Sequence, residues 1–218
     1  MARRNQFEGV TCYTCGRPAV GVEHAPPQSC FPKGKREQPI TVPACAKHNQ
    51  DKNLEDELIK ATVVLSNNGS PDGMEVLESV IRAMENDEAK MKVFMPLPKL
   101  VKINGVDRGT CRINLARFNR SITLIVRALW FKERGQKLHA NIQVQWHQLK
   151  TSNLDPHPAL GPLSKLANAR PGDYKGFYPE IFRYDFHECP DKKGVVHWVC
   201  RLCFYDALPI ITTWAVKP

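Results

Sequence analysis

Two pairs of metal-binding side chains stand out near the start of this 218-residue chain. Two residues separate Cys12 from Cys15, two separate Cys45 from His48, and 29 residues lie between the pairs. A two-residue gap lets both side chains of a pair reach one ion from a single tight turn. Three thiolates and one imidazole suit tetrahedral zinc. The spacing therefore predicts a structural Zn²⁺ site formed by these four residues.

Between the two pairs lies an acidic residue joined to a histidine, Glu23-His24, and Asn49 follows the last zinc ligand directly. Histidine is the side chain whose ordinary pKa allows it to exchange a proton near neutral pH. We expect the zinc to staple this segment and the chemistry to take place beside it, at Glu23, His24 and Asn49.

The elements that would position these residues are two strands and a helix. Residues 19–24 are rich in β-branched side chains and predict a strand that ends at Glu23-His24. Residues 39–44 predict a second strand, whose two prolines place it at a sheet edge, and a helix is expected from Lys47. Strand, loop, strand and helix together form a ββα unit.

The rest of the chain predicts helices first and strands later. Apolar spacing predicts a helix over 54–65, which the stretch 67–73 stops, and a second helical run over 77–95. A further apolar stripe, Leu115, Phe118, Ile122, Ile125 and Leu129, predicts a helix closed by Gly135. Strands are expected at 142–146, 176–188, 194–205 and 210–216, with a long loop over 151–173. The predicted class is α+β, with a ββα-metal domain at 1–56, an acidic helical connector at 57–98 and a basic, mixed helix and antiparallel-strand domain at 99–218.

Composition and charge narrow the function classes. The chain is 42% hydrophobic and 24% charged, as soluble globular proteins are, and its first residues lack the apolar core of a signal peptide. With no apolar run of membrane-spanning length, we expect a cytoplasmic protein with no membrane partner. The net charge is +9, with +4 over residues 1–53, −5 over 54–98 and +10 over 99–218. That layout favours a polyanionic partner, which we expect to be nucleic acid.

Over residues 10–60, the chain resembles the zinc-stapled branch of the HNH (His-Me finger) endonucleases, whose members include phage and bacterial proteins. The resemblance rests on Cys12-x2-Cys15, Glu23-His24 and Cys45-x2-His48-Asn49-x2-Lys52. It implies a ββα-metal fold and hydrolysis of phosphodiester bonds, with double-stranded DNA as the expected substrate. His24 would be the general base that activates water, and Glu23 and Asn49 would bind a catalytic Mg²⁺ or Mn²⁺. Lys52 would neutralise a phosphate, and the zinc would be structural.

The chain departs from the family pattern in three places. Glu23 replaces the commoner aspartate, His48 replaces a cysteine, and the middle asparagine expected shortly before Cys45 is missing. The missing asparagine favours an alternative, a catalytically inactive, zinc-stabilised module that only binds nucleic acid. A third alternative is a zinc-stabilised protein-interaction domain, which would show no salt-dependent binding of nucleic acid.

A second group of possible ligands lies near the C-terminus: Cys189, His197, Cys200 and Cys203. Residues 195–205 read as one continuous strand. Residues three apart in a strand point to opposite faces, so Cys200 and Cys203 are poorly placed to chelate one ion. We interpret them as strand residues.

Overall fold

A computed structural model describes residues 7–37, 40–66, 69–87, 99–103, 106–110, 113–146 and 174–216. These residues form helices and antiparallel sheets, which confirms the predicted α+β class. In the part of the chain so described, no helix is both long and apolar enough to cross a membrane.

The N-terminal part is a β-hairpin followed by a helix. Strands β1 (Gly21–His24) and β2 (Thr41–Ala44) pair antiparallel, with Glu23 opposite Val42 and His24 opposite Thr41. Helix α1 (Asn53–Leu65) follows two short 3₁₀ turns, Ala46–His48 and Gln50–Lys52. The α-helix therefore begins later than the predicted Lys47, because Asn49, with φ −129° and ψ −72°, interrupts the helical backbone.

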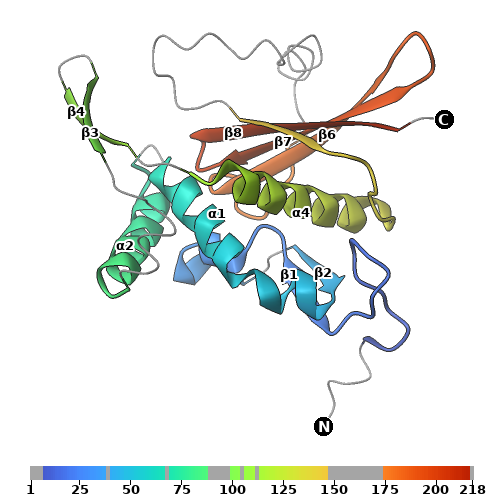
Figure 1. Ribbon diagram of the computed structural model, residues 1–218, viewed down its shortest axis with the longest axis horizontal. Coiled ribbons are helices and arrows are strands. Elements are labelled where there is room, and N and C mark those ends of the chain that lie inside the picture. The colour runs from blue at the N-terminus through green and yellow to red at the C-terminus, as the bar shows by residue number, and fades with distance from the viewer. Residues whose placement is uncertain are drawn as a thin grey trace.

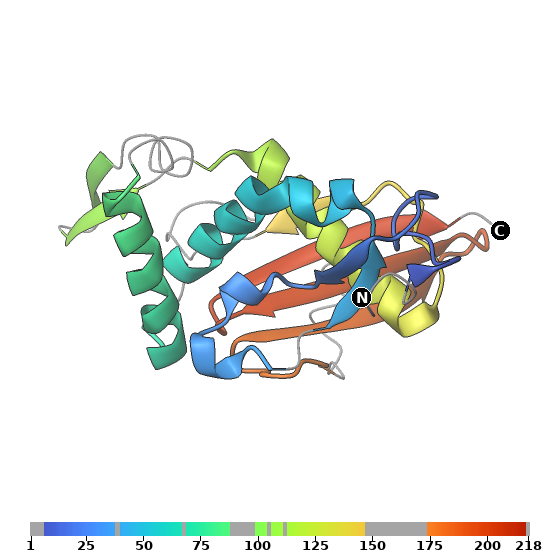
Figure 2. The same ribbon diagram turned by 90° about the horizontal axis from the view of Figure 1, so that it is seen from below.

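Helix α2 (Pro71–Glu85) begins inside the stretch that was expected to separate two helices. The Ser70 hydroxyl accepts a hydrogen bond from the Gly73 N–H, and proline suits the first helical turn because it has no N–H to satisfy. A hairpin that was not predicted, β3 (Lys99–Ile103) and β4 (Val106–Thr110), lies near α2 at one end of the molecule (Figures 1 and 2).

Helix α4 (Leu115–Arg134) occupies the centre of the molecule. The Asn114 side chain accepts a hydrogen bond from the Arg117 N–H at its start, and Gly135, with φ +65°, closes it as predicted. The predicted apolar stripe is buried except at its first member, Leu115, which remains 50% exposed. The helix lies between the N-terminal hairpin with α1 on one side and a four-stranded sheet on the other (Figure 1).

The sheet has the order β5-β8-β7-β6, and all its neighbours are antiparallel. Its strands are β5 (Gln143–Trp146), β6 (Phe182–Pro190), β7 (Val196–Phe204) and β8 (Leu208–Val216). Strands were predicted in all four regions, but β6 begins at Phe182 instead of residue 176. The predicted loop at 151–173 lies outside the described residues.

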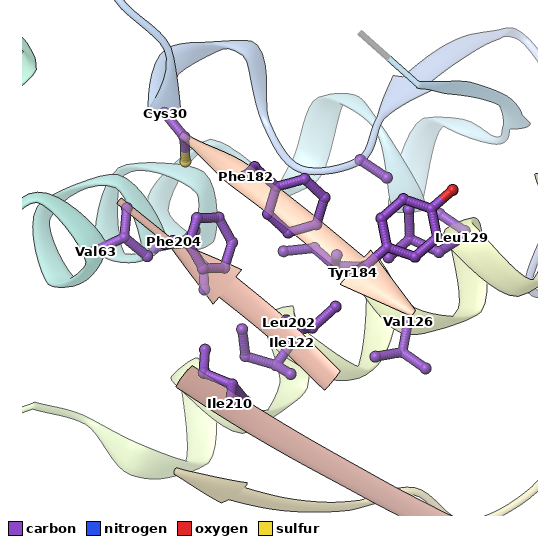
Figure 3. Packing of buried hydrophobic residues seen from close by; sticks show 14 of the residues in the cluster. Cys30, Val63, Ile122, Val126, Leu129, Phe182, Tyr184, Leu202, Phe204 and Ile210 are labelled. Atoms are coloured by element: carbon purple, nitrogen blue, oxygen red, sulfur yellow. The ribbon is translucent and has the colours of Figure 1, made fainter. Parts of the chain in front are cut away.

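One hydrophobic cluster joins these layers and includes residues from Cys12 to Trp214. Figure 3 shows side chains of the sheet, among them Phe182, Phe204 and Ile210, gathered over Ile122 and Val126 of α4. At the other end of the helix, Trp130 packs edge-on against two sheet residues, with ring centroids 4.9 Å from Trp198 and 5.5 Å from Trp214. Helix α4 thus forms a shared wall for the sheet and for the segment that carries the predicted site.

Candidate metal centre and adjacent pocket

The four predicted zinc ligands converge. Their ligand atoms all lie within 4.8 Å of one another, although the two pairs come from opposite ends of the β1–β2 hairpin segment. The Sγ atoms of Cys15 and Cys45 are 3.8 Å apart, and His48 Nδ1 lies 3.3 to 3.6 Å from the three sulfurs.

The separation of Cys15 from Cys45 and the three distances from His48 match a tetrahedral zinc site. Bonds of about 2.3 Å to sulfur and about 2.0 Å to nitrogen would separate two sulfurs by about 3.8 Å and a sulfur from the nitrogen by about 3.5 Å. The cluster can therefore hold a structural metal ion such as Zn²⁺. Within the described residues, it is the one group of three or more Cys, His, Asp or Glu side chains with this convergence.

Backbone hydrogen bonds hold the two ligand pairs in place. The Cys12 N–H donates to the Arg17 carbonyl at 2.9 Å and closes the first turn, and the His48 N–H donates to the Cys45 carbonyl at 3.0 Å and closes the second. The Tyr13 N–H donates to the Pro43 carbonyl at 2.8 Å, which ties the first turn to β2. The ligand geometry is therefore fixed by the same strand that pairs with β1.

Helix α4 and the segment after it brace the metal cluster from outside. The Lys137 ammonium donates to the Cys15 carbonyl at 2.8 Å and to the Thr11 hydroxyl at 2.7 Å. The Arg127 guanidinium donates to the Thr14 hydroxyl at 3.3 Å. These contacts join the first ligand turn to residues more than a hundred positions away in sequence.

A pocket lies beside the cluster, and three of the predicted catalytic residues line it: Glu23, His24 and Lys52. Ser121, Leu124, Ile125 and Ala128 of α4 form part of its wall. Tyr13 also lines it, and the Tyr13 ring packs edge-on against the His48 ring at 6.4 Å. The metal cluster and the pocket therefore share a wall.

Asn49, the fourth predicted residue, lies close to β1. Its Nδ2 would be 2.9 Å from a Cβ built on Gly21, so a side chain at position 21 would displace the amide. Gly21 and Glu23 lie on the same face of the strand because side chains alternate. The structure thus places Asn49 over the strand face that carries Glu23.

The Lys52 ammonium contacts two carboxylates, those of Glu23 and of Asp56 one turn along α1. Glu23 is 6% exposed and Lys52 is 8% exposed. The Asp56 side chain is 27% exposed, and one ammonium balances only one of the two carboxylates when both are ionised. Burial accordingly raises the pKa of Glu23 to about 7, although the Lys52 charge acts to lower it.

His24 lies at the end of β1 and is half-buried. Burial lowers its pKa below the ordinary value of 6.5, and the nearby Lys52 charge lowers it further. The imidazole is therefore neutral at pH 7, and a neutral imidazole can accept a proton.

Sequence reasoning missed three residues of this site: Tyr13, Asp56 and Ser121. Asp56 was detectable, because a carboxylate four residues after Lys52 on a helix lies within reach of its ammonium. Tyr13 and Ser121 reach the pocket through tertiary packing, and no spacing in the sequence indicates either.

Cys200 and Cys203 are strand residues, as the sequence indicated. Cys200 and Cys203 lie within β7, where Cys200 is fully buried and Cys203 is half-buried, and Cys189 pairs with His197 across the β6–β7 register. Their ligand atoms do not converge in the described residues.

Comparison with known proteins returned no match to a protein family model, to a curated protein or to a solved structure.

Proposed function

We propose that this protein is a metal-dependent, HNH-type endonuclease that hydrolyses phosphodiester bonds in nucleic acid. The observation that carries the proposal is the pocket in which Glu23, His24 and Lys52 meet beside a Cys₃His cluster. The order β1, β2, α1 agrees with a ββα-metal unit, with the cluster next to the first turns of the helix.

His24 acts as the general base in this proposal. Because its pKa is lowered, the imidazole is mainly neutral at pH 7. The neutral ring can take a proton from the water molecule that attacks the phosphorus. The His24 side chain is only half-buried, which leaves it open to a substrate phosphate.

Glu23 and Asn49 would hold the catalytic divalent ion. A carboxylate and an amide oxygen are the hard donors that Mg²⁺ and Mn²⁺ prefer, and both residues lie over one face of β1. When Glu23 and Asp56 are both ionised, the excess negative charge around Lys52 also suits an added cation. When bound, such an ion would polarise the phosphate and stabilise charge on the leaving oxygen.

Lys52 is already engaged by Glu23 and Asp56 and would contribute positive charge beside the phosphate. Exposed cations lie near the metal cluster: burial lowers the pKa of His48, and the charges of Lys47, Arg120 and Arg17 lower it further. Such side chains supply most of the affinity for a nucleic-acid backbone and make that affinity depend on salt.

The second candidate is a zinc-stabilised module that binds nucleic acid without cutting it. The contact between Lys52 and Glu23 favours this alternative, because the ammonium occupies a carboxylate that the catalytic ion would need. The missing middle asparagine points the same way.

Cleavage of supercoiled plasmid by zinc-loaded protein, with Mg²⁺ or Mn²⁺ added, tests the proposal. Wild-type protein should nick or linearise the plasmid, and His24→Ala should not, while its zinc content stays at one ion per chain. His139→Ala is the matched control, since His139 is an exposed histidine on the segment after α4. If neither wild type nor control cuts but both bind plasmid, the silent module is the better account. Cutting by His24→Ala at the wild-type rate would place the active site elsewhere.

A further inference from the structure

A second pocket opens on the other side of the loop that follows His24. Its aromatic lining comes from two distant segments. Phe31 lies in the loop after β1, Phe177 and Tyr178 lie just before β6, and Phe182 begins β6. The Phe31 and Tyr178 ring centroids are 6.4 Å apart, and those of Phe177 and Tyr178 are 5.4 Å apart. We call this the aromatic pocket.

The rings of the aromatic pocket divide into a floor and an open edge. Phe31 and Phe182 are 6% and 2% exposed and belong to the core, whereas Phe177 is 52% exposed. Phe177 therefore leaves a large part of its ring surface available to a planar ligand. Stacking on such a face is how proteins hold unpaired bases.

The pocket is held in shape by contacts that do not use its open ring. The Arg36 Nε donates to the Phe31 carbonyl at 2.9 Å, and the Lys35 ammonium bonds Asp72 and Glu180, both at 2.9 Å. The Tyr205 hydroxyl donates to the Cys30 carbonyl. Residues that are already fixed before binding lose little conformational entropy when a ligand binds.

Two cations line the aromatic pocket, and they differ in what they can offer a ligand. Asp72 and Glu180 already balance the Lys35 charge, which lies 5.6 Å from the Tyr178 ring centroid. Arg36 uses its Nε on a carbonyl, and the rest of its guanidinium is the group that could meet a phosphate or the edge of a base. A planar ring with an adjoining anion fits this lining better than a purely apolar ligand.

The aromatic pocket is next to the proposed catalytic pocket. Ala25, which follows His24 directly, lines both of them, and its N–H donates to the Ile40 carbonyl at 2.8 Å. A nucleotide whose phosphate lies at His24 would therefore have the aromatic pocket within reach of a neighbouring base.

We propose that one unstacked nucleobase next to the scissile phosphate stacks on the exposed ring of Phe177, at the edge of the aromatic pocket. The inference rests on the proposed function and defines its substrate class: nucleic acid that is single-stranded or carries an unpaired base at the cleavage point. A base inside a perfect duplex is stacked on both faces and cannot stack on Phe177 without being turned out of the helix.

Binding of labelled oligonucleotides, followed by fluorescence anisotropy, tests this inference. Zinc-loaded protein without added Mg²⁺ or Mn²⁺ keeps the substrate intact. The probes are a perfect duplex, the same duplex with one unpaired base, and that duplex with an abasic unit in place of the unpaired base. An RNA version of each probe shows whether the bound base belongs to DNA or to RNA.

Wild-type protein should bind the unpaired-base probe more tightly than the other two. Phe177→Ala should weaken that binding by roughly 5- to 150-fold, as expected for the loss of one stacking platform, and leave the other probes within about twofold. Phe177→Tyr should restore it. Met74→Ala is the control, because Met74 is also exposed but lies on α2.

Equal binding of the unpaired-base and abasic probes by wild type would overturn the inference, as would an equal effect of Phe177→Ala on all three probes. The result is independent of cutting. If neither the plasmid nor the unpaired-base probe is cut when Mg²⁺ or Mn²⁺ is added and the base preference holds, the endonuclease proposal falls and the base-binding inference stands. If cleavage depends on His24 and the base preference is absent, the pocket inference alone is wrong.

Discussion

At the scale of single residues, the arrangement around Lys52 determines the properties of the candidate site. Glu23, Asp56 and His24 each sense its charge, and Lys52 itself is largely buried. Although burial lowers the pKa of Lys52, the two carboxylates raise it, so the ammonium stays charged. Burial lowers the pKa of His24, and the positive charge fixed at Lys52 lowers it further.

This dependence gives a pH prediction. The pKa of His24, measured by NMR titration of zinc-loaded protein without Mg²⁺, should lie below 6.5, and Lys52→Met should raise it. Lys132→Met, which removes an exposed lysine of α4, should leave it unchanged. Because protonation of His24 is harder in the folded chain than in the unfolded one, its contribution to the free energy of unfolding should decline as the pH falls below 6.5. A wild-type value above 6.5 would contradict the prediction.

The metal ligands give a second prediction at this scale. Cys45→Ser should abolish stoichiometric zinc binding measured by elemental analysis, whereas His48→Cys should keep one zinc per chain because a thiolate can complete the tetrahedron. Cys203→Ser serves as the control and should also keep one zinc. Loss of zinc from the control would show that a β7 cysteine takes part in metal binding.

At the scale of elements, α4 is the part that both the sequence and the structure identify clearly. Ile122→Ala should lower the free energy of unfolding by about 2 to 5 kcal/mol, because Ile122 is fully buried between α4 and the sheet. Leu115→Ala, on the same predicted stripe but 50% exposed, should change it by less than about 0.5 kcal/mol. Urea denaturation followed by circular dichroism measures both. Equal effects would mean that the α4 packing described here is wrong.

Patterns local in sequence predicted these elements well. Turn spacing identified the metal cluster, alternation identified the strands of the large sheet, and Gly135 marked the end of α4. The hairpin β3–β4 was missed, and the start of α1 was wrong because no local signal shows that Asn49 leaves the helical region. The aromatic pocket could not be predicted at all, since Phe31 and Tyr178 come together only through tertiary packing of distant segments.

At the scale of the whole molecule, a single core joins the metal cluster to the sheet. The predicted boundary between residues 56 and 57 falls within α1, and Lys137 and Arg127 tie the first ligand turn to the C-terminal part. The metal-binding segment and the sheet are therefore expected to unfold together in one transition.

Thermal unfolding tests that expectation. Tryptophan fluorescence reports on the sheet through Trp130, Trp198 and Trp214, and it should show one cooperative transition. Removing zinc with a chelator should lower that transition temperature. Zinc binds the folded chain in preference to the unfolded chain, so its binding free energy stabilises the whole fold. A sheet transition unchanged by chelation would show that the two regions unfold separately.

The hydrogen bond from Tyr205 to the Cys30 carbonyl spans 175 positions of the chain. During translation, the loop that contains Cys30 is made 175 positions before the side chain that anchors it. A prematurely terminated product would carry every metal ligand and His24 without the anchor for the loop beside them. This order of synthesis would delay a fully formed site until Tyr205 has been made.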